Sequence, residues 1–407
     1  MLSGMEPFNL NLRHLRAVAL MKRLGSLTAA AAAAHLTQPA LTQGLARLER
    51  ALGVPLFDRR PDGTRPTSAG DAIADAVDAA FDHLSRGSRV PSVRGFSRPE
   101  DLVTGPQLKA LVAFADAGSL AGAATAIGLS QPSLHRALHD LSQIVGAPLV
   151  ERRGRGLVLT DPGRRLARGA RLAKADLRLG IAEATGAPDD GRAVVIGTMP
   201  LARARLLPLA INSLLRTRPD ARVRVVEGSW HGLVEPLRDG YIDMMIGAMR
   251  DIVPADLAQH ELLVDPVAVV GRAGHPLAGT LPTLQDLARF PWVVSAPGAP
   301  LRARWETMFS GSVQPPAPIE CGSVIVTRGL LAGSDMLTLL SPEQIAVELA
   351  AGVLASVTDA LPELERRIGI TTRSPWRAGR LQQAAMDALG SAASVISSGN
   401  VMTTSPL

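Results

Sequence analysis

Two short stretches of the chain place hydrogen-bonding side chains along one edge of a predicted helix. The first, HLTQPALTQGLARLE, begins at His35, and the second, GLSQPSLHRALHDLS, begins at Gly128, 93 residues later. Outward amide and guanidinium groups near a helix N-terminus can pair with base edges in a major groove, Gln with adenine and Arg with guanine. The predicted base-reading residues are Gln38, Thr42, Gln43 and Arg47 in the first stretch, and Gln131, Ser133, His135 and Arg136 in the second. The predicted DNA-binding set also includes the residues at the start of each helix, Thr37, Pro39, Ser130 and Pro132.

Basic, glycine-bearing turns follow both stretches, with the sequences RRPDGTRPT and RRGRGLVLT. Arginines in such turns can lie along phosphates, which sets the register of a protein on a duplex without specifying sequence. The predicted phosphate contacts are Arg59, Arg60, Arg65, Arg152, Arg153 and Arg155. A helical hairpin with a solvated polar face is the alternative, and it is less favoured because both copies keep the same turn residues.

An internal repeat positions these residues. At an offset of 93, residues 15–70 align without a gap on residues 108–163, and 22 of the 56 positions are identical. Each copy is predicted to form a helix, a short helix, a turn, a third helix and a two-stranded wing, with Ser26, Ser119, Thr37 and Ser130 as N-caps. A period this long indicates a duplicated small domain, because solenoid repeats are shorter. In the third helices, apolar residues at helical spacing face the core: Leu41, Leu45, Leu48 and Leu52, and Leu134, Leu138, Leu141 and Val145.

A further amphipathic helix is predicted after each wing. One apolar face carries Ile73, Val77, Phe81 and Leu84, and the other carries Leu166, Ala170, Ala173, Leu177 and Ile181. Between the first of these helices and the second copy lies RGSRVPSVRGFSRPEDL, whose composition is typical of a tether. We hypothesise that the two helices of one chain pack together as a pseudo-dimer, and pairing between chains is equally open.

The second half of the chain has an α/β pattern. The strand-like runs AVVIG, RVRVVE and IDMMIG alternate with helical patterns, which predicts a largely parallel sheet. VAVVGRAGHPLAG crosses to a second lobe, and RRIGITTRSPW with a terminal helix returns to the first lobe. In α/β lobes ligands bind at the carboxyl ends of strands, here between the lobes.

Composition and charge narrow the class of protein. The chain carries a net charge of +6, and its first 190 residues hold 24 Lys and Arg against 18 Asp and Glu, whereas the remainder holds 19 of each. Basic surface confined to one half is expected of a polyanion-binding module joined to a neutral one. No apolar stretch is long enough to span a membrane and no signal peptide is recognisable, so we expect a cytoplasmic protein without a membrane partner.

Enzymatic chemistry is not predicted. The single cysteine, Cys321, can form no intrachain disulfide or thiolate metal site, the histidines are scattered, and catalytic motifs such as GxSxG, HExxH or a P-loop are absent. We therefore expect no catalytic residues, no metal and no cofactor. A small-molecule-binding protein without regulatory DNA binding is the alternative function, but it leaves the basic repeat unexplained, and a DNA-binding architectural protein leaves the two-lobed half unexplained.

The stretches GSLTAAAAAAHLTQPALTQGLARLERALGVPLFDRR and GSLAGAATAIGLSQPSLHRALHDLSQIVGAPLVERRGRGLVLTDPG resemble the winged helix-turn-helix of LysR-type transcriptional regulators. The departures are the presence of two copies, and Asp62 in the first wing where the second has Arg155. The resemblance implies a multidomain fold: two all-α-rich winged helix-turn-helix domains with linker helices, then a two-lobed α/β effector domain of periplasmic-binding-protein type. It also implies a regulator that binds double-stranded DNA under the control of a small-molecule effector, works as a homodimer or homotetramer, and has RNA polymerase as a further partner.

The implied boundaries follow the repeat. They are residues 10–70 for the first winged helix-turn-helix, 71–86 for its linker helix, 87–104 for the tether, 105–163 for the second winged helix-turn-helix, 164–190 for its linker helix, 191–270 with 346–398 for effector lobe I, and 271–345 for lobe II.

The effector half is most similar to the branch that contains the protocatechuate and galactose-binding-protein regulators, through IGTMP, GHPLAG and PGAPLR. By resemblance the effector site comprises Thr198, Met199, Pro200, Leu201, Ser229, Trp230, Ser295, Gly298, Arg302, Ser323 and Val324. Many relatives carry a hydroxyl at the position of Leu201. The leucine makes the site of this chain less polar at that point, or suits it to a different ligand. Arg302 is the candidate for holding a carboxylate, such as that of an aromatic or sugar-derived acid, by a bidentate pair. The alternative for Arg302 is that of a surface arginine that supports its loop. The alternative for Trp230 is a place in the core instead of stacking on a ligand.

Overall fold

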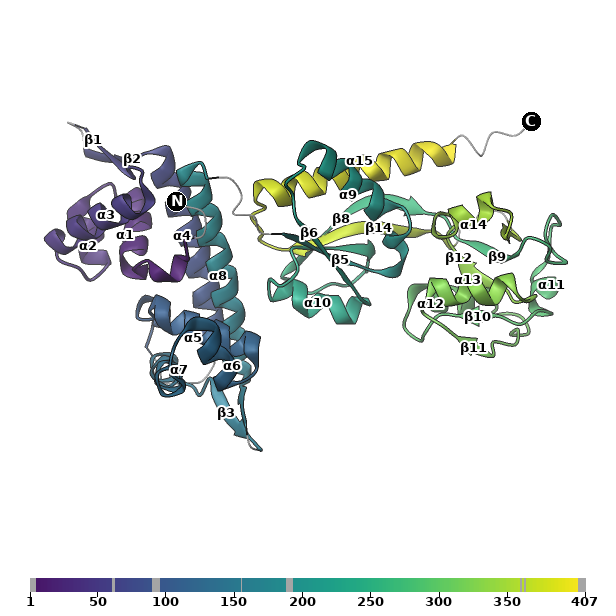
Figure 1. The fold of residues 1–407 in the computed structure, drawn as a ribbon, viewed down its shortest axis with the longest axis horizontal. Coiled ribbons are helices and arrows are strands. Elements are labelled where there is room, and N and C mark those ends of the chain that lie inside the picture. The colour runs from purple at the N-terminus through teal and green to yellow at the C-terminus, as the bar shows by residue number, and fades with distance from the viewer. Residues whose placement is uncertain are drawn as a thin grey trace. The chain divides into compact units, whose positions relative to one another are not determined.

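The computed structural model describes residues 5–60, 63–89, 96–154, 156–187, 193–358, 361 and 364–401. The chain divides into two compact units, Met1–Arg192 and Ala193–Leu407, which are described separately (Figure 1).

In the first unit the same series of elements occurs twice. The first series is α1 Leu12–Leu24, α2 Leu27–Ala33, α3 Gln38–Leu52, β1 Phe57–Arg60, β2 Gly63–Pro66 and α4 Ser68–Ser88. The second is α5 Gly105–Ala117, α6 Leu120–Ile127, α7 Gln131–Val145, β3 Val150–Arg153, β4 Gly156–Leu159 and α8 Asp161–Thr185. A 3-10 turn precedes each series: η1 Pro7–Asn9 and η2 Pro99–Asp101. We call residues 12–66 the first module, residues 105–159 the second module, and α4 and α8 the linker helices.

Matched local signals begin and end the third helix of each module. The hydroxyls of Thr37 and Ser130 accept the backbone N–H three residues later and so cap α3 and α7. Gly53 (φ 71°) and Gly146 (φ 77°) end these helices in the left-handed conformation, which a residue with a Cβ adopts only at a cost. The turn chemistry of both modules is therefore local and was readable from the sequence.

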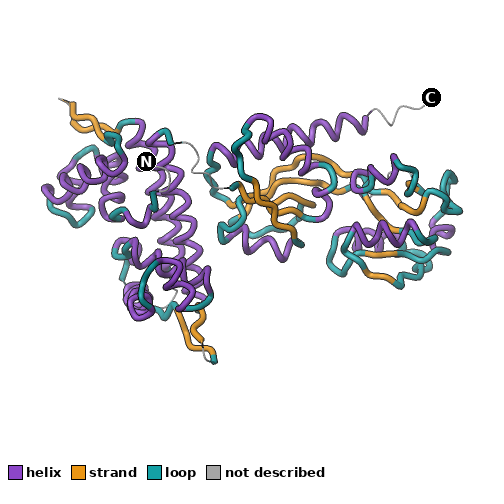
Figure 2. The backbone as a smooth tube through the Cα atoms, in the orientation of Figure 1, coloured by secondary structure: helices purple, strands orange, loops and turns teal. Residues whose placement is uncertain are grey.

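The linker helices pack along each other within the chain, and Figures 1 and 2 show them side by side, running past both modules. They run antiparallel, because Gly87 near the end of α4 meets the start of α8, and Gly180 near the end of α8 meets Ala76 of α4. One apolar core joins both modules and both linker helices. Of the two pairings that the sequence leaves open, the intramolecular one is observed.

The second unit is built on a five-stranded sheet of order β6-β5-β7-β14-β8. Strands β5, β6 and β7 are parallel, and β14 pairs antiparallel with both β7 and β8. Apolar residues of α9 and α15 share one core with the sheet, and those of α10 share another. This lobe comprises β5 Val194–Thr198, η3 Pro200–Arg203, α9 Leu206–Thr217, β6 Val223–Glu227, α10 Trp230–Arg238, β7 Met244–Ala248, β8 Leu257–Asp265, β14 Arg366–Arg373 and α15 Arg380–Val401.

A second lobe is inserted between β8 and β14. It holds a three-stranded sheet of order β12-β9-β13 and the parallel pair β10 and β11. Its elements are β9 Ala268–Arg272, α11 Leu284–Ala288, β10 Val293–Val294, α12 Pro300–Met308, β11 Ile319–Glu320, α13 Val324–Ala332, β12 Thr338–Leu340, η4 Pro342–Gln344, α14 Ala346–Ala350 and β13 Leu354–Ser356.

The predicted lobe boundaries need correction. The boundary after residue 270 cuts through β9, and the return at residue 346 comes too early, because β13 pairs antiparallel with β9 inside the second lobe. The chain returns to the first lobe only at β14, which begins at Arg366. A three-residue strand has too little periodicity to be assigned from sequence, since its place is decided by its pairing partner.

Candidate nucleic-acid interface and effector site

The outward face of α3 carries the predicted base-reading side chains of the first module. The apolar face is buried through Leu41, Leu45, Leu48 and Leu52. On the opposite face the exposed residues are Thr37, Gln38, Pro39, Thr42, Gln43 and Arg47. The Oγ1 of Thr42 donates to the carbonyl oxygen of Gln38 over 3.0 Å, so this hydroxyl is already used within the helix. Gln43 and Arg47 are therefore the long outward donors beyond the first turn of this helix, and Gln38 lies within that first turn.

The outward face of α7 has the same arrangement with different side chains. Leu134, Leu138, Leu141 and Val145 are buried, and the exposed residues are Ser130, Gln131, Pro132, Ser133, His135 and Arg136. The hydroxyls of Ser130 and Ser133 lie 2.8 Å apart and hydrogen-bond to each other. Arg136 occupies the position of Gln43, so a guanidinium replaces an amide at this point of the repeat.

The two-stranded hairpins carry the predicted phosphate contacts. Arg65 on β2 is exposed, as are Arg152 and Arg153 on β3. The backbone of Arg59 and Arg60 belongs to β1, but their side chains lie outside the described residues, as do Arg155 and Asp62 entirely.

A half-buried histidine of the first module packs against α3. The ring of His14 lies so close to Gly44 of α3 that a Cβ there would be 2.6 Å from its Cδ2 atom. Burial, with the positive charge of Arg47, lowers the pKa of His14 below its ordinary value. The second module has Gln107 and Ala137 at these two positions.

In the first lobe of the second unit, predicted effector residues meet at the carboxyl ends of β5 and β6. The carbonyl oxygen of Thr198 accepts the N–H of Gly228 over 3.2 Å, which brings the two loops together. Ser229 is exposed and caps α10, and Pro200 is exposed in η3. Leu201 is half-buried against the lobe core.

Two of the predicted residues in this lobe have little surface left for a ligand. Thr198 is completely buried, and its hydroxyl donates to the carbonyl oxygen of Met199 over 3.2 Å. Met199 is itself buried. Trp230, the first residue of α10, is half-buried, and the guanidinium carbon of Arg250 lies 5.7 Å from its ring centroid. The side chain of Trp230 therefore packs against the core of this lobe, as the alternative to ligand stacking describes.

In the second lobe the predicted residues follow the parallel strands β10 and β11. The N–H of Cys321 donates to the carbonyl oxygen of Val294 over 2.8 Å, so the loops after these strands are neighbours. Ser295 is half-buried after β10, and Gly298 (φ 77°) turns the loop into α12. On the adjoining loop Ser323 is exposed and caps α13, and Val324 packs beside it.

Arg302 lies in the first turns of α12 and already has a partner. Its Nε donates to Oε1 of Glu306 over 2.6 Å, and its guanidinium carbon lies 5.3 Å from the ring centroid of Trp305. The guanidinium is thus held against the helix by an ion pair of the kind found on helix surfaces. A ligand carboxylate would have to replace or share Glu306.

Comparison with known proteins assigns the chain. Residues 189–394 match the LysR substrate binding domain, and residues 12–71 and 106–164 both match the bacterial regulatory helix-turn-helix protein of the LysR family. The transcriptional regulator GalR of Pseudomonas putida is 34% identical over 385 residues, which cover 93% of this chain and 95% of that relative. The chain belongs to the LysR family.

A second relative and a solved structure are also similar to this LysR-family chain. The transcriptional regulator GbpR of Rhizobium radiobacter is 31% identical over 289 residues, which cover 68% of this chain and 94% of that relative, and supports the expected branch. The solved structure of ArgP from Mycobacterium tuberculosis shares the fold with a TM-score of 0.59, at 19% identity, over 72% of this chain and 98% of that one. The protein is thus a DNA-binding transcriptional regulator with an effector-binding domain of periplasmic-binding-protein type, and its family is not one of enzymes.

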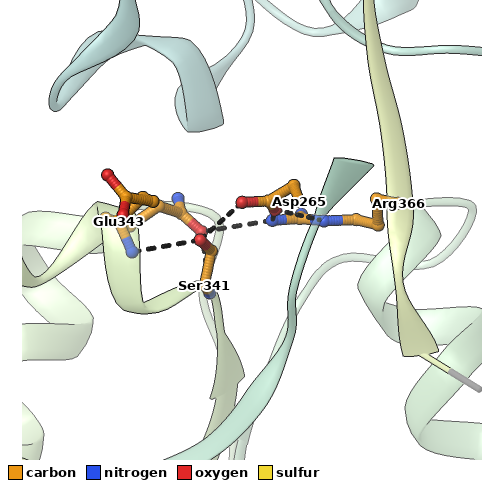
Figure 3. Close-up of polar contacts among 5 residues, drawn as sticks. Asp265, Ser341, Glu343 and Arg366 are labelled. Carbon is orange, nitrogen blue, oxygen red and sulfur yellow. Dashed lines mark hydrogen bonds and ion pairs between the residues drawn. The ribbon is translucent and has the colours of Figure 1, made fainter. Parts of the chain in front are cut away.

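A buried polar network links the two lobes of the LysR substrate-binding domain, and the sequence analysis did not predict it. Asp265 ends β8, Ser341 follows β12 and Arg366 begins β14. The hydroxyl of Ser341 donates to Oδ1 of Asp265 over 2.6 Å, and Nε of Arg366 donates to Oδ2 over 3.1 Å (Figure 3). Burial raises the pKa of Asp265, and the charge of Arg366 opposes that rise. The signals in the sequence were an Asp that ends an apolar strand and an Arg that begins one, but their pairing spans 101 residues.

Among the described residues of this LysR-family chain, no helix is both long and apolar enough to cross a bilayer. In the same part of the chain no three His, Cys, Asp or Glu side chains gather in an arrangement that could hold a metal ion.

Proposed function

We propose that both modules are winged helix-turn-helix domains and that both bind DNA. The observation that carries this proposal is the repeated placement of exposed hydrogen-bonding side chains on α3 and α7, above helix faces that are buried in the core. A helix whose inner face is fixed by a core offers its outer face in one orientation, which reading of base edges requires.

The roles divide by chemistry. Gln43 and Arg47 on α3, and Arg136 with His135 on α7, are the base-reading groups, because they are long, exposed side chains beyond the first turn of their helices. Arg65, Arg152 and Arg153 on the hairpins contact phosphates, and the proposal extends to Arg59, Arg60 and Arg155. The capping residues Thr37 and Ser130, with Gln38, Pro39, Thr42, Gln131, Pro132 and Ser133, shape the helix N-terminus that approaches the duplex.

For the effector site we propose a small carboxylate ligand, an aromatic or sugar-derived acid. Exposed groups at the carboxyl ends of parallel strands in each lobe support it, namely Pro200, Ser229, Gly298 and Ser323. Arg302 supplies the charge, with Ser295 beside it, and Leu201, Trp230 and Val324 supply apolar walls. Thr198 and Met199 support these loops from beneath, because they are buried.

An effector regulates DNA binding by binding one arrangement of the lobes more tightly than another, which shifts the population. We further propose that chains associate as homodimers or homotetramers and that the DNA-bound assembly contacts RNA polymerase. Because duplex DNA is the partner, we place the protein in the cytoplasm.

Selection of duplexes from a randomised library by the full-length protein tests this function. The expected result is enrichment of one sequence class, bound at least about a thousandfold more tightly than random duplex. Matched titrations with and without a panel of aromatic and sugar acids test the effector. Failure to enrich any sequence contradicts specific DNA binding, and unchanged affinity with every acid contradicts the ligand class.

A further inference from the structure

The contact between the linker helices repeats itself about a pseudo-twofold axis. A Cβ atom on Gly87 of α4 would lie 2.9 Å from the carbonyl oxygen of Arg165 on α8. A Cβ atom on Gly180 of α8 would lie 3.0 Å from the carbonyl oxygen of Ala72 on α4. Gly180 is the repeat equivalent of Gly87, and Arg165 is that of Ala72, each at the offset of 93. Reciprocal contacts of this kind define the interface of a twofold dimer, and here both halves belong to one chain.

The residues on this axis have diverged into a complementary pair. Nε2 of His83 lies 3.2 Å from Oδ2 of Asp176, and these two positions are equivalent in the repeat. Symmetric pairing of α4 with the α4 of another chain would place His83 against His83. Symmetric pairing of two α8 helices would place Asp176 against Asp176, which like charges disfavour. The pair therefore favours contact between the two different linker helices.

The net charges of the two linker helices also favour pairing of α4 with α8. Between Ser68 and Ser88, α4 carries four Asp and one Arg, a net charge of −3. Between Asp161 and Thr185, α8 carries six Lys or Arg and three Asp or Glu, a net charge of +3. The opposite net charges favour α4 with α8 over either symmetric pairing as a long-range effect, because Asp71 and Asp75 pair directly with Lys22 of α1, and Arg171 pairs with Asp116 of α5.

Each module also reaches across to the other. The turn η1, which precedes the first module, packs on α5 and α8, and η2, which precedes the second module, packs on α4. Oε2 of Glu6 lies 2.8 Å from Nζ of Lys174 and 3.2 Å from a guanidinium nitrogen of Arg178, both on α8. The contacts of η1, η2 and Glu6 therefore hold the two modules together in addition to the packing of the linker helices.

The helices α3 and α7, which are proposed to read the DNA, carry different side chains at positions that are equivalent in the repeat. Gln43 corresponds to Arg136, and Arg47 corresponds to Asp140. An amide selects adenine and a guanidinium selects guanine, whereas a carboxylate accepts from cytosine. Two such surfaces cannot favour the same sequence.

We propose that a single chain is a complete reader of a composite operator whose two half-sites have unlike sequences, one read by α3 and the other by α7. The inference rests on the proposed function, that both modules bind DNA. The linker helix of 21 residues, α4, is about 31 Å long, close to the length of one turn of B-DNA, so the half-sites lie about one turn or more apart.

Two exposed substitutions test the assignment of half-sites without disturbing the core. Using the selected duplex, Gln43→Ala is expected to relax base preference in one half-site only, and Arg136→Ala in the other only. Duplexes that carry either half-site twice should bind the unsubstituted protein at least about tenfold more weakly than the composite duplex, the effect of a single mismatched base pair. Equal binding of a symmetric duplex, or an effect of either variant on both half-sites, overturns the proposal.

A mixing experiment tests whether the two readers act within one chain. Gln43→Ala chains and Arg136→Ala chains, mixed before the titration, should bind no better than the tighter of the two alone. Recovery of the unsubstituted affinity would show that modules pair between chains, and would overturn the proposal while leaving DNA binding intact. Absence of sequence preference in the unsubstituted protein would instead contradict the proposed function itself.

Discussion

Nε of Arg302 lies 2.6 Å from Oε1 of Glu306, one turn further along α12. The proposed ligand carboxylate therefore competes with a carboxylate of the protein. The competition is mild, because an ion pair four residues apart on a helix surface is worth about 0.3–0.5 kcal/mol.

Substitution of this pair tests the effector site. Arg302→Ala should weaken binding of the effector acid about tenfold or more, the worth of a charge-assisted hydrogen bond, and leave DNA affinity without effector unchanged. Glu306→Gln should strengthen effector binding about twofold, because the guanidinium is released. Isothermal titration calorimetry measures both, and unaltered affinity in Arg302→Ala would rule out its role.

Base reading and phosphate contact are separable by specificity and salt. Arg136→Ala should weaken binding to the selected duplex about fivefold to a hundredfold and leave binding to random duplex unchanged. Arg153→Ala should weaken both about equally and reduce the slope of log affinity against log salt by about 0.9. Titrations of both duplexes at two salt concentrations distinguish the roles, and equal losses in Arg136→Ala would reject base reading.

His14 should make the stability of the first unit depend on pH. Its pKa is lowered in the folded protein, so below the ordinary value of 6.5 the unfolded chain binds the proton more readily. Stability is therefore fully present above that value and decreases as pH falls below it. His14→Gln, which copies Gln107 of the second module, should remove this decrease. Urea unfolding across the range from about pH 8 to about pH 5 measures the slope, and an unchanged slope in the variant would exclude His14 as its source.

The close contact of the linker helices should tolerate no added methyl group at Gly169. A Cβ there would lie 2.5 Å from the carbonyl oxygen of His83, so Gly169→Ala should destabilise the first unit by about 1–3 kcal/mol. Gly390 in α15 has open space around its Cβ position, and Gly390→Ala should stabilise its own unit by up to about 1 kcal/mol. Thermal unfolding that shows no loss for Gly169→Ala would contradict the observed helix spacing.

The sequence predicted best what local chemistry determines. The caps at Thr37 and Ser130 and the leucine spacing of α3 and α7 are decided within a few residues, so both modules were predictable. The ion pair of Arg302 with Glu306 was not predicted, although its four-residue spacing in one helix is a local signal. The network of Asp265 with Arg366, and the place of β13 in the second lobe, depend on partners far away in the chain and needed the structure.

The repeat also shows one structural task performed by unlike residues. Oε1 of Glu49 accepts the N–H of Leu56, and in the second module the Oγ of Ser142 accepts the N–H of Leu149. Both acceptors hold the loop that leads into the hairpin. Sequence comparison of the two copies hides this equivalence, since carboxylate and hydroxyl share only the capacity to accept.

Because α4 and α8 are parts of one polypeptide, their pairing cannot be lost by dilution. Dimers of separate subunits dissociate when few copies are present, whereas tethered partners keep a high effective concentration in every molecule. A cell with a handful of these chains would still hold each of them fully assembled at this contact. For the same reason, a defective chain could not inactivate an intact chain by pairing with it at the contact of α4 with α8.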